Sequence, residues 1–275
     1  MSKEQNDKGQ QNLSDPDRLL VEYVQGQLSA VEEGKVLVDF MRGQQVDLAF
    51  EWDSSGASWS EDGKTLSFSR DMNRALVLGA MAREYRRAWI GAHNGIETPS
   101  SHIDDIVFAA RVVEGDVMSY QLSLMTALLH QGVLGDVAKG FSSVATADAA
   151  AQELMEYASA FIVKHKENPF SEQARLETFA FLQRSRFFHD ELDIVTASKA
   201  LSSPSVTAPH RPTNILRLCD VFEKAAVSTC RSATQAYLPH GLYETSYLKK
   251  AIIDQANKNI VSAPVREKSK PRKPA

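Results

Sequence analysis

The sequence contains few of the residues that build disulfide frameworks or cysteine-based metal sites. Its 275 residues include two cysteines, Cys219 and Cys230, which lie eleven positions apart in a stretch with a helical pattern. Helix geometry would separate them by roughly 16 Å along the axis, whereas a disulfide needs Cα atoms within about 7 Å. Neither cysteine belongs to a CxxC pair, so the sequence argues against both a disulfide scaffold and a cysteine zinc site.

Long apolar runs and common enzyme signatures are also missing. No segment has the length and hydrophobicity of a membrane-spanning helix, and residues 1–17 contain no apolar core of the kind found in signal peptides. A glycine-rich phosphate loop and a GxSxG nucleophile elbow are absent. None of the seven histidines pairs with another at a short helical spacing. We therefore expect a cytoplasmic protein without a membrane span.

What is present is an ordinary globular composition with an uneven distribution of charge. Apolar residues make up 43% of the chain and charged residues 24%, as in most folded domains. The net charge is −4, but residues 262–275 hold five basic residues and one acidic residue, so the remainder carries −8. An acidic body disfavours nucleic acid as a partner and leaves a protein partner as the open alternative.

The hydrophobic pattern predicts local structure along most of the chain. Residues 46–52 and 64–69 alternate apolar and polar positions around turn-forming residues, which indicates an antiparallel β-hairpin or small sheet. Residues 17–42 have helical spacing, with a break expected near Gly34. Later helices are expected to start at hydroxyl caps: one runs from Ser69 to about residue 93, others span 102–131 and 146–167, and one extends from Ser171 towards Lys199.

These elements define the fold class as α+β and mainly α-helical, with a small antiparallel sheet followed by a helix bundle. Composition divides the chain into five segments. We expect a disordered N-terminus at 1–16, a main domain at 17–200, a Pro/Ser-rich linker at 201–212, C-terminal helices packed on the domain at 213–261, and a basic disordered tail at 262–275.

The stretch MAREYRRAW (81–89) places charged residues on a helix whose opposite sides are both largely apolar. Such a helix packs on more than one face, so Arg83 and Arg87, one turn apart, do not define a solvated stripe. Arginines that face inward need anionic partners, because an unpaired buried charge is costly. We therefore expect carboxylates close to this pair.

The following helix supplies a candidate carboxylate. Glu114 shares a helical face with apolar residues. Its local partner would be Arg111, one turn earlier, and its partner across a helix–helix contact would be the pair Arg83 and Arg87. Asp116 falls on the other side of the same helix, among serines, and we interpret that face as solvated.

Several motifs occur in an order that resembles a bacterial zincin-like family of metallopeptidase domains. They are KTLSFS (64–69), REYRRAW (83–89), EGDV (114–117), NPF (168–170) and the aromatic-rich run at 178–192. In that family a β-hairpin leads into a helix bearing His-Glu-Leu-Arg-His-Ala-Trp, and a second helix carries Glu-Ala-Asp-Ala. The resemblance covers roughly residues 35–200 and implies a zincin-like fold for the main domain.

The resemblance implies a metal site that has lost its metal. Glu84 matches the general base, Glu114 (or, as second choice, Asp116) matches a third metal ligand, and Arg83 and Arg87 stand in place of both histidine ligands. Guanidinium groups stay protonated and offer no lone pair, so we expect zinc to be lost and Glu84 to be a vestigial base. The two fixed cations would instead neutralise the carboxylates.

We favour an inactive, metallopeptidase-like domain that serves as a binding or scaffold module, and not an enzyme. Two alternatives stay open: an active zinc-dependent hydrolase with non-standard ligands, and a helical interaction protein unrelated to peptidases. The substitution Glu84→Ala separates the last alternative from the first, because it is costly only if Glu84 belongs to a buried charge cluster.

Overall fold

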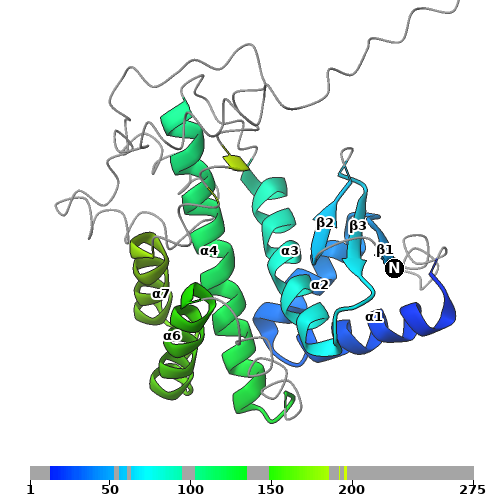
Figure 1. Ribbon diagram of the computed structural model, residues 1–275. Helices are drawn as coiled ribbons and strands as arrows, with labels where there is room; N and C mark the ends of the chain where they lie inside the picture. The colour runs from blue at the N-terminus through cyan, green and yellow to red at the C-terminus, as the bar shows by residue number, and fades with distance from the viewer. Residues whose placement is uncertain are drawn as a thin grey trace, which may run out of the picture.

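The computed structural model describes residues 13–52, 56–60, 63–94, 103–134, 149–185, 192 and 195–196. Within these ranges the chain is mainly helical with a small sheet, as expected for the fold class (Figure 1). No helix in them combines the length and hydrophobicity that a bilayer span requires. The expected linker, the C-terminal helices, the basic tail and both cysteines lie outside the described residues.

The predicted elements occur in the expected order, β2 is an additional strand, and several helix bounds differ from the prediction. The elements are α1 (Asp15–Leu28), α2 (Glu32–Gly43), β1 (Asp47–Glu51), β2 (Ala57–Trp59), β3 (Thr65–Ser69), α3 (Arg74–Asn94), α4 (Ile103–His130), α6 (Ala149–His165) and α7 (Glu172–Arg184). Ser69 ends β3 and does not cap α3; instead the Leu76 amide donates to Asn73 Oδ1 (3.0 Å). α7 begins after its predicted cap, Ser171, but ends at Arg184 because Ser185 is extended.

The junction of α1 and α2 explains the role of Gly34, which was expected to mark a helix break. The break lies at 29–31, and Gly34 belongs to the first turn of α2. A Cβ at Gly34 would lie 2.0 Å from the Leu28 carbonyl oxygen, so glycine permits the close approach of the two helices. The amide of Asp17 donates to Ser14 Oγ (3.4 Å), and α1 therefore starts inside the segment expected to be disordered.

The sheet is mixed, and the predicted antiparallel hairpin is wrong. The two predicted strands, β1 and β3, pair in parallel with Leu48 beside Leu66, and β2 pairs antiparallel with the other edge of β3. Parallel neighbours cannot be joined by a tight turn, so the chain must reverse twice between them. Glycines at positive φ flank β2, Gly56 (+87°) and Gly63 (+67°). The three-residue strand between them is too short for an alternation signal.

Helix α3 occupies the centre of the described structure. Figure 1 shows α4 on one side of it, followed by α6 and α7, and the sheet with α1 and α2 on the other side. One hydrophobic core joins α1, α2, α3, α4 and the sheet, and it includes Val21, Leu37, Leu66, Met81 and Leu124. Because α3 is covered from two directions, two of its charged residues, Glu84 and Arg86, are buried.

The α6–α7 pair is held by an aromatic stack and an ion-pair group. The rings of Tyr157 and Phe181 stack with centroids 3.9 Å apart. Near the end of α6, Lys164 Nζ donates to both oxygens of Glu177 on α7 (2.7 and 2.8 Å), and His165 Nε2 lies 2.9 Å from the same carboxylate. The hydrogen bond from Lys164 is the main reason that the pKa of Glu177 falls from its usual 4.5 to about 2.

This lowered pKa predicts a specific dependence on pH for Glu177→Gln. A carboxylate whose pKa is lower in the folded protein than in the unfolded chain stabilises the folded state at pH values above its unfolded-state pKa. That stabilisation is lost as the pH falls and the carboxylate is protonated in the folded protein. The variant should therefore be less stable than the parent at pH 7, and the difference should shrink as the pH falls from 4.5 towards 2. Denaturant unfolding across this range measures the effect.

Glu167→Gln is the control, because Glu167 is 74% exposed and its nearest cationic contact is 3.8 Å away. It should have little effect at any pH. A stability difference for Glu177→Gln that stayed constant from pH 7 to pH 2 would contradict the assigned ion-pair group.

Candidate functional site

Helix α3 brings its charged residues to carboxylates because α4 lies close against it and runs antiparallel. A Cβ at Gly79 would lie 3.0 Å from Gln121 Nε2 of α4, so a small residue is favoured at this contact. Two turns further along α3, Arg87 pairs with Glu114, two turns earlier on α4. The close packing of the two backbones thus determines which arginines meet which carboxylates.

The carboxylate of Glu84 is the buried centre of the site, at 1% exposure. It accepts a hydrogen bond from Trp59 Nε1 on β2 (3.0 Å) and one from Arg83 Nε (3.3 Å). Arg87 donates to the same carboxylate and, with its other terminal nitrogen, to Glu114. We call these five residues, Trp59, Arg83, Glu84, Arg87 and Glu114, the Glu84 cluster.

The Glu84 cluster is electrically balanced, with two arginines and two glutamates. The side chains of Arg83 and Arg87 are 36% and 33% exposed, so each stem is partly covered while the carboxylate of Glu84 is shielded. Burial by itself lowers the pKa of Arg87, but the charges of Glu114 and Glu84 outweigh it and raise that pKa above its ordinary value. Arg87 therefore keeps its positive charge.

Asp116 is not solvated, and the expectation for its helix face is wrong. It is 1% exposed and accepts from Arg86 Nε (2.9 Å) on α3 and from Arg175 (3.4 Å) on α7. The face that it shares with Ser119 and Ser123 is buried because α4 is covered on that side too. Asp116 therefore belongs to a second group, the Asp116 cluster of Arg86, Asp116 and Arg175.

Arg86, Arg175 and Trp59 were not predicted as site residues. The guanidinium of Arg86 lies between two rings, 4.6 Å from that of Trp89 and 4.5 Å from that of Tyr120. Arg86 and Arg87 are adjacent on a helix, so their side chains point in different directions. This adjacency was a signal for two separate carboxylate partners. Trp59 left no signal, because its role depends on the unpredicted strand β2.

The residues of the Glu84 cluster do not fit a zinc ion. The guanidinium of Arg87 bridges the two carboxylates that the resemblance assigns to the metal site. A guanidinium carries five N–H donors and has no lone pair for a metal. In the part of the chain that the structure describes, no group of three or more His, Cys, Asp or Glu side chains is placed to hold a metal. The cluster instead suits reciprocal charge-assisted hydrogen bonding.

Comparisons with known proteins identify no relative. No family model matches the chain, and no curated protein or solved structure is significantly similar to it. The functional interpretation therefore depends on the geometry of the two clusters.

The Glu84 cluster predicts that Glu84→Ala is destabilising. Removing the carboxylate would leave Arg87 with one partner and Trp59 Nε1 without its acceptor. We expect the free energy of unfolding to fall by about 1–3 kcal/mol, measured by denaturant titration. Glu22→Ala, an exposed position on α1, is the matched control and should change stability by about 0.5 kcal/mol or less. Equal effects of the two substitutions would argue against a buried cluster.

The Asp116 cluster predicts a larger loss for Asp116→Asn. The substitution keeps the shape of the side chain but removes the charge that faces Arg86 and Arg175, two largely covered cations. Breaking a buried pair on one side costs about 3–5 kcal/mol, and unfolding experiments should show a loss in that range. Asp39→Asn, whose side chain is 58% exposed, should be near neutral. A near-neutral Asp116→Asn would mean that water reaches the cluster.

Proposed function

We propose that the chain is a zincin-like domain in which arginines have replaced the metal, and that it serves as a non-catalytic binding or scaffold module. The observation that carries this proposal is the position of Arg87 between Glu84 and Glu114. A cytoplasmic location and a protein partner are part of the same proposal.

The order and spacing of the cluster residues support the comparison with a metal site. Arg83 and Arg87 are one helical turn apart on α3, Glu84 follows the first of them, and Glu114 comes from the next helix. Two ligands at positions i and i+4 with a glutamate between them, plus a third ligand from elsewhere, form the ligand set of a zinc peptidase. Here side chains at the corresponding positions meet at one place.

Charge balance explains why arginine is a suitable replacement. Without a divalent cation, two partly buried glutamates would repel each other and lose hydration. Arg83 and Arg87 supply two positive charges and directed N–H donors, so the helix pair stays neutral and hydrogen-bonded. This arrangement preserves the scaffold while providing neither a metal-bound water nor a Lewis acid, and it therefore favours a role in binding over catalysis.

Restoring the histidines tests the proposal directly. If the scaffold is zincin-like, the double variant Arg83→His/Arg87→His should bind about one zinc ion per chain, with Glu114 as the third protein ligand. The parent protein should not bind zinc stoichiometrically. Elemental analysis after dialysis, together with isothermal titration of zinc into the metal-free protein, measures both.

Two further variants give the experiment its controls. Arg87→His alone supplies one histidine and should bind zinc much more weakly than the double variant. Adding Glu114→Gln to the double variant should weaken binding by roughly tenfold or more, because a ligand is lost. A folded double variant that gains no zinc would overturn the zincin-like interpretation. Stoichiometric zinc in the parent protein would contradict the proposal that arginines have replaced the metal.

A further inference from the structure

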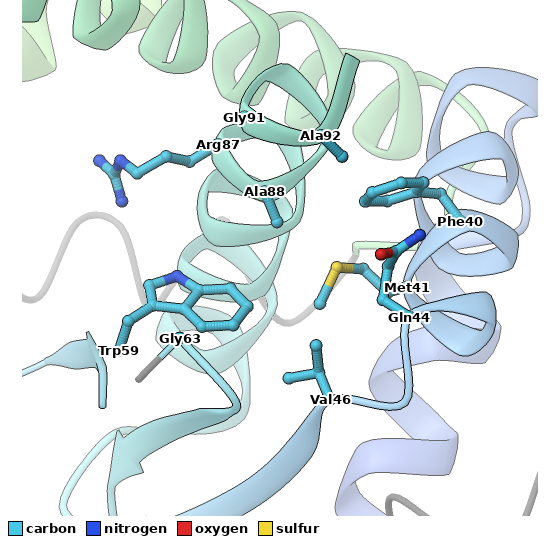
Figure 2. Close-up of a pocket in the computed structure, with 10 residues that line it drawn as sticks. All are labelled: Phe40, Met41, Gln44, Val46, Trp59, Gly63, Arg87, Ala88, Gly91 and Ala92. Carbon is cyan, nitrogen blue, oxygen red and sulfur yellow. The ribbon is translucent and has the colours of Figure 1, made fainter. Parts of the chain in front are cut away.

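A cavity of about 370 Å³ lies beside the Glu84 cluster, between α2, α3 and the sheet. Figure 2 shows Met41 and Val46 directed into it from one side, the ring of Trp59 from another, and Ala88 and Ala92 from α3. A cavity of this volume with mostly apolar walls is within the range of small-molecule sites, which span roughly 300–1,000 Å³.

The charges around the cavity favour an uncharged occupant. Among the residues that the structure describes, the lining includes no carboxylate, and Arg87 is its one cationic residue. Figure 2 shows the guanidinium of Arg87 directed away from the cavity, and it is bonded to Glu84 and Glu114. The amide of Gln44, on an exposed residue of the lining, offers a neutral donor and acceptor. Among the described residues of the lining, an anion would find no cation other than Arg87, which is already paired with two carboxylates.

The helix wall is built from small residues, which leaves space for a flat group. Ala88, Gly91 and Ala92 follow one another at i, i+3 and i+4 on α3 and all line the cavity. A Cβ added at Gly91 would meet no atom within 4 Å. Phe40 and Trp59 supply aromatic surface on the other walls, and such surface packs well against a ring.

Trp59 belongs both to the Glu84 cluster and to the wall of the cavity. Its Nε1 donates to Glu84, while its ring lines the cavity. The hydrogen bond holds the ring in one orientation, so this wall exists before any ligand arrives. Preformed walls lower the entropic cost of binding.

We propose that this cavity binds one small, neutral, ring-containing molecule, with a hydrogen-bonding group directed towards Gln44. The inference goes beyond the proposed function, because it does not depend on how the arginines arose or on whether the scaffold is zincin-like. The zinc experiment above and the binding experiment below have separate readouts, so either proposal can fail alone.

A matched pair of fluorescent probes tests the proposal on the full chain. N-phenyl-1-naphthylamine is neutral, apolar and carries one N–H donor, and 8-anilino-1-naphthalenesulfonate has the same rings with a sulfonate added. The neutral probe should bind saturably with one molecule per chain, and the anionic probe roughly tenfold or more weakly. Fluorescence titration measures both affinities.

Two substitutions locate the binding. Gly91→Leu and Ala92→Phe fill the cavity from α3 and should each weaken binding of the neutral probe by roughly tenfold or more. Gly26→Leu is the control for Gly91→Leu, because Gly26 is also an exposed helical glycine with no atom within 4 Å of an added Cβ, and it lies on α1 outside the lining. It should bind the probe like the parent.

Circular dichroism confirms that each variant is folded. Three outcomes would overturn the proposal: no saturable binding to the full chain, which includes the case in which a segment of the chain itself fills the cavity; binding that Gly91→Leu and Ala92→Phe leave unchanged; or tighter binding of the anionic probe than of the neutral one.

Discussion

The contact between α3 and α4 depends on the neutralisation of arginines that the surrounding helices cover. Arg86 and Arg87 are neighbours in sequence, yet they pair with different carboxylates, Asp116 and Glu114. Sliding α4 along α3 would disturb both pairs at once, and it would leave Arg86 and Glu114 without these partners. Buried ion pairs add little net stability compared with apolar packing, but breaking one is expensive. The two clusters therefore specify the register of the helix pair.

Aromatic side chains make this burial possible by covering the cations. Arg86 lies between the rings of Trp89 and Tyr120, where the attraction of the ring faces partly offsets lost hydration. The hydroxyl of Tyr120 donates to the Glu33 carbonyl of α2 (2.9 Å). Burial raises the pKa of Tyr120 to about 12, so the phenol keeps its proton and this link persists at neutral pH. The charge network of α3 and α4 is thereby connected to α2.

Helices and caps with local sequence signals could be predicted, whereas strand pairing and burial that depend on neighbouring segments could not. Caps such as Ser171 and the spacing of apolar residues located most helices. The two apolar sides of α3 correctly indicated that Arg83 and Arg87 have carboxylate partners. The strand pairing could not be predicted, because β1 and β3 pair directly although β2 lies between them in the sequence, and β2 has only three residues. Asp116 was misassigned because a helical wheel gives the direction of a side chain but not what covers it. With α7 packed there, a polar face is interior.

If both proposals hold, the Glu84 cluster has the structural role and the cavity has the binding role, and Trp59 belongs to both. A metal can leave its ligands, whereas the positive charges of Arg83 and Arg87 are covalently fixed, so the helix pair keeps its geometry whatever the metal supply. Trp59 then connects this fixed cluster to the cavity. An occupant that tilted the indole would break its bond to Glu84 and leave a buried carboxylate less well satisfied. Occupants are therefore selected for fit to a rigid wall, which favours flat groups that match the ring as it stands.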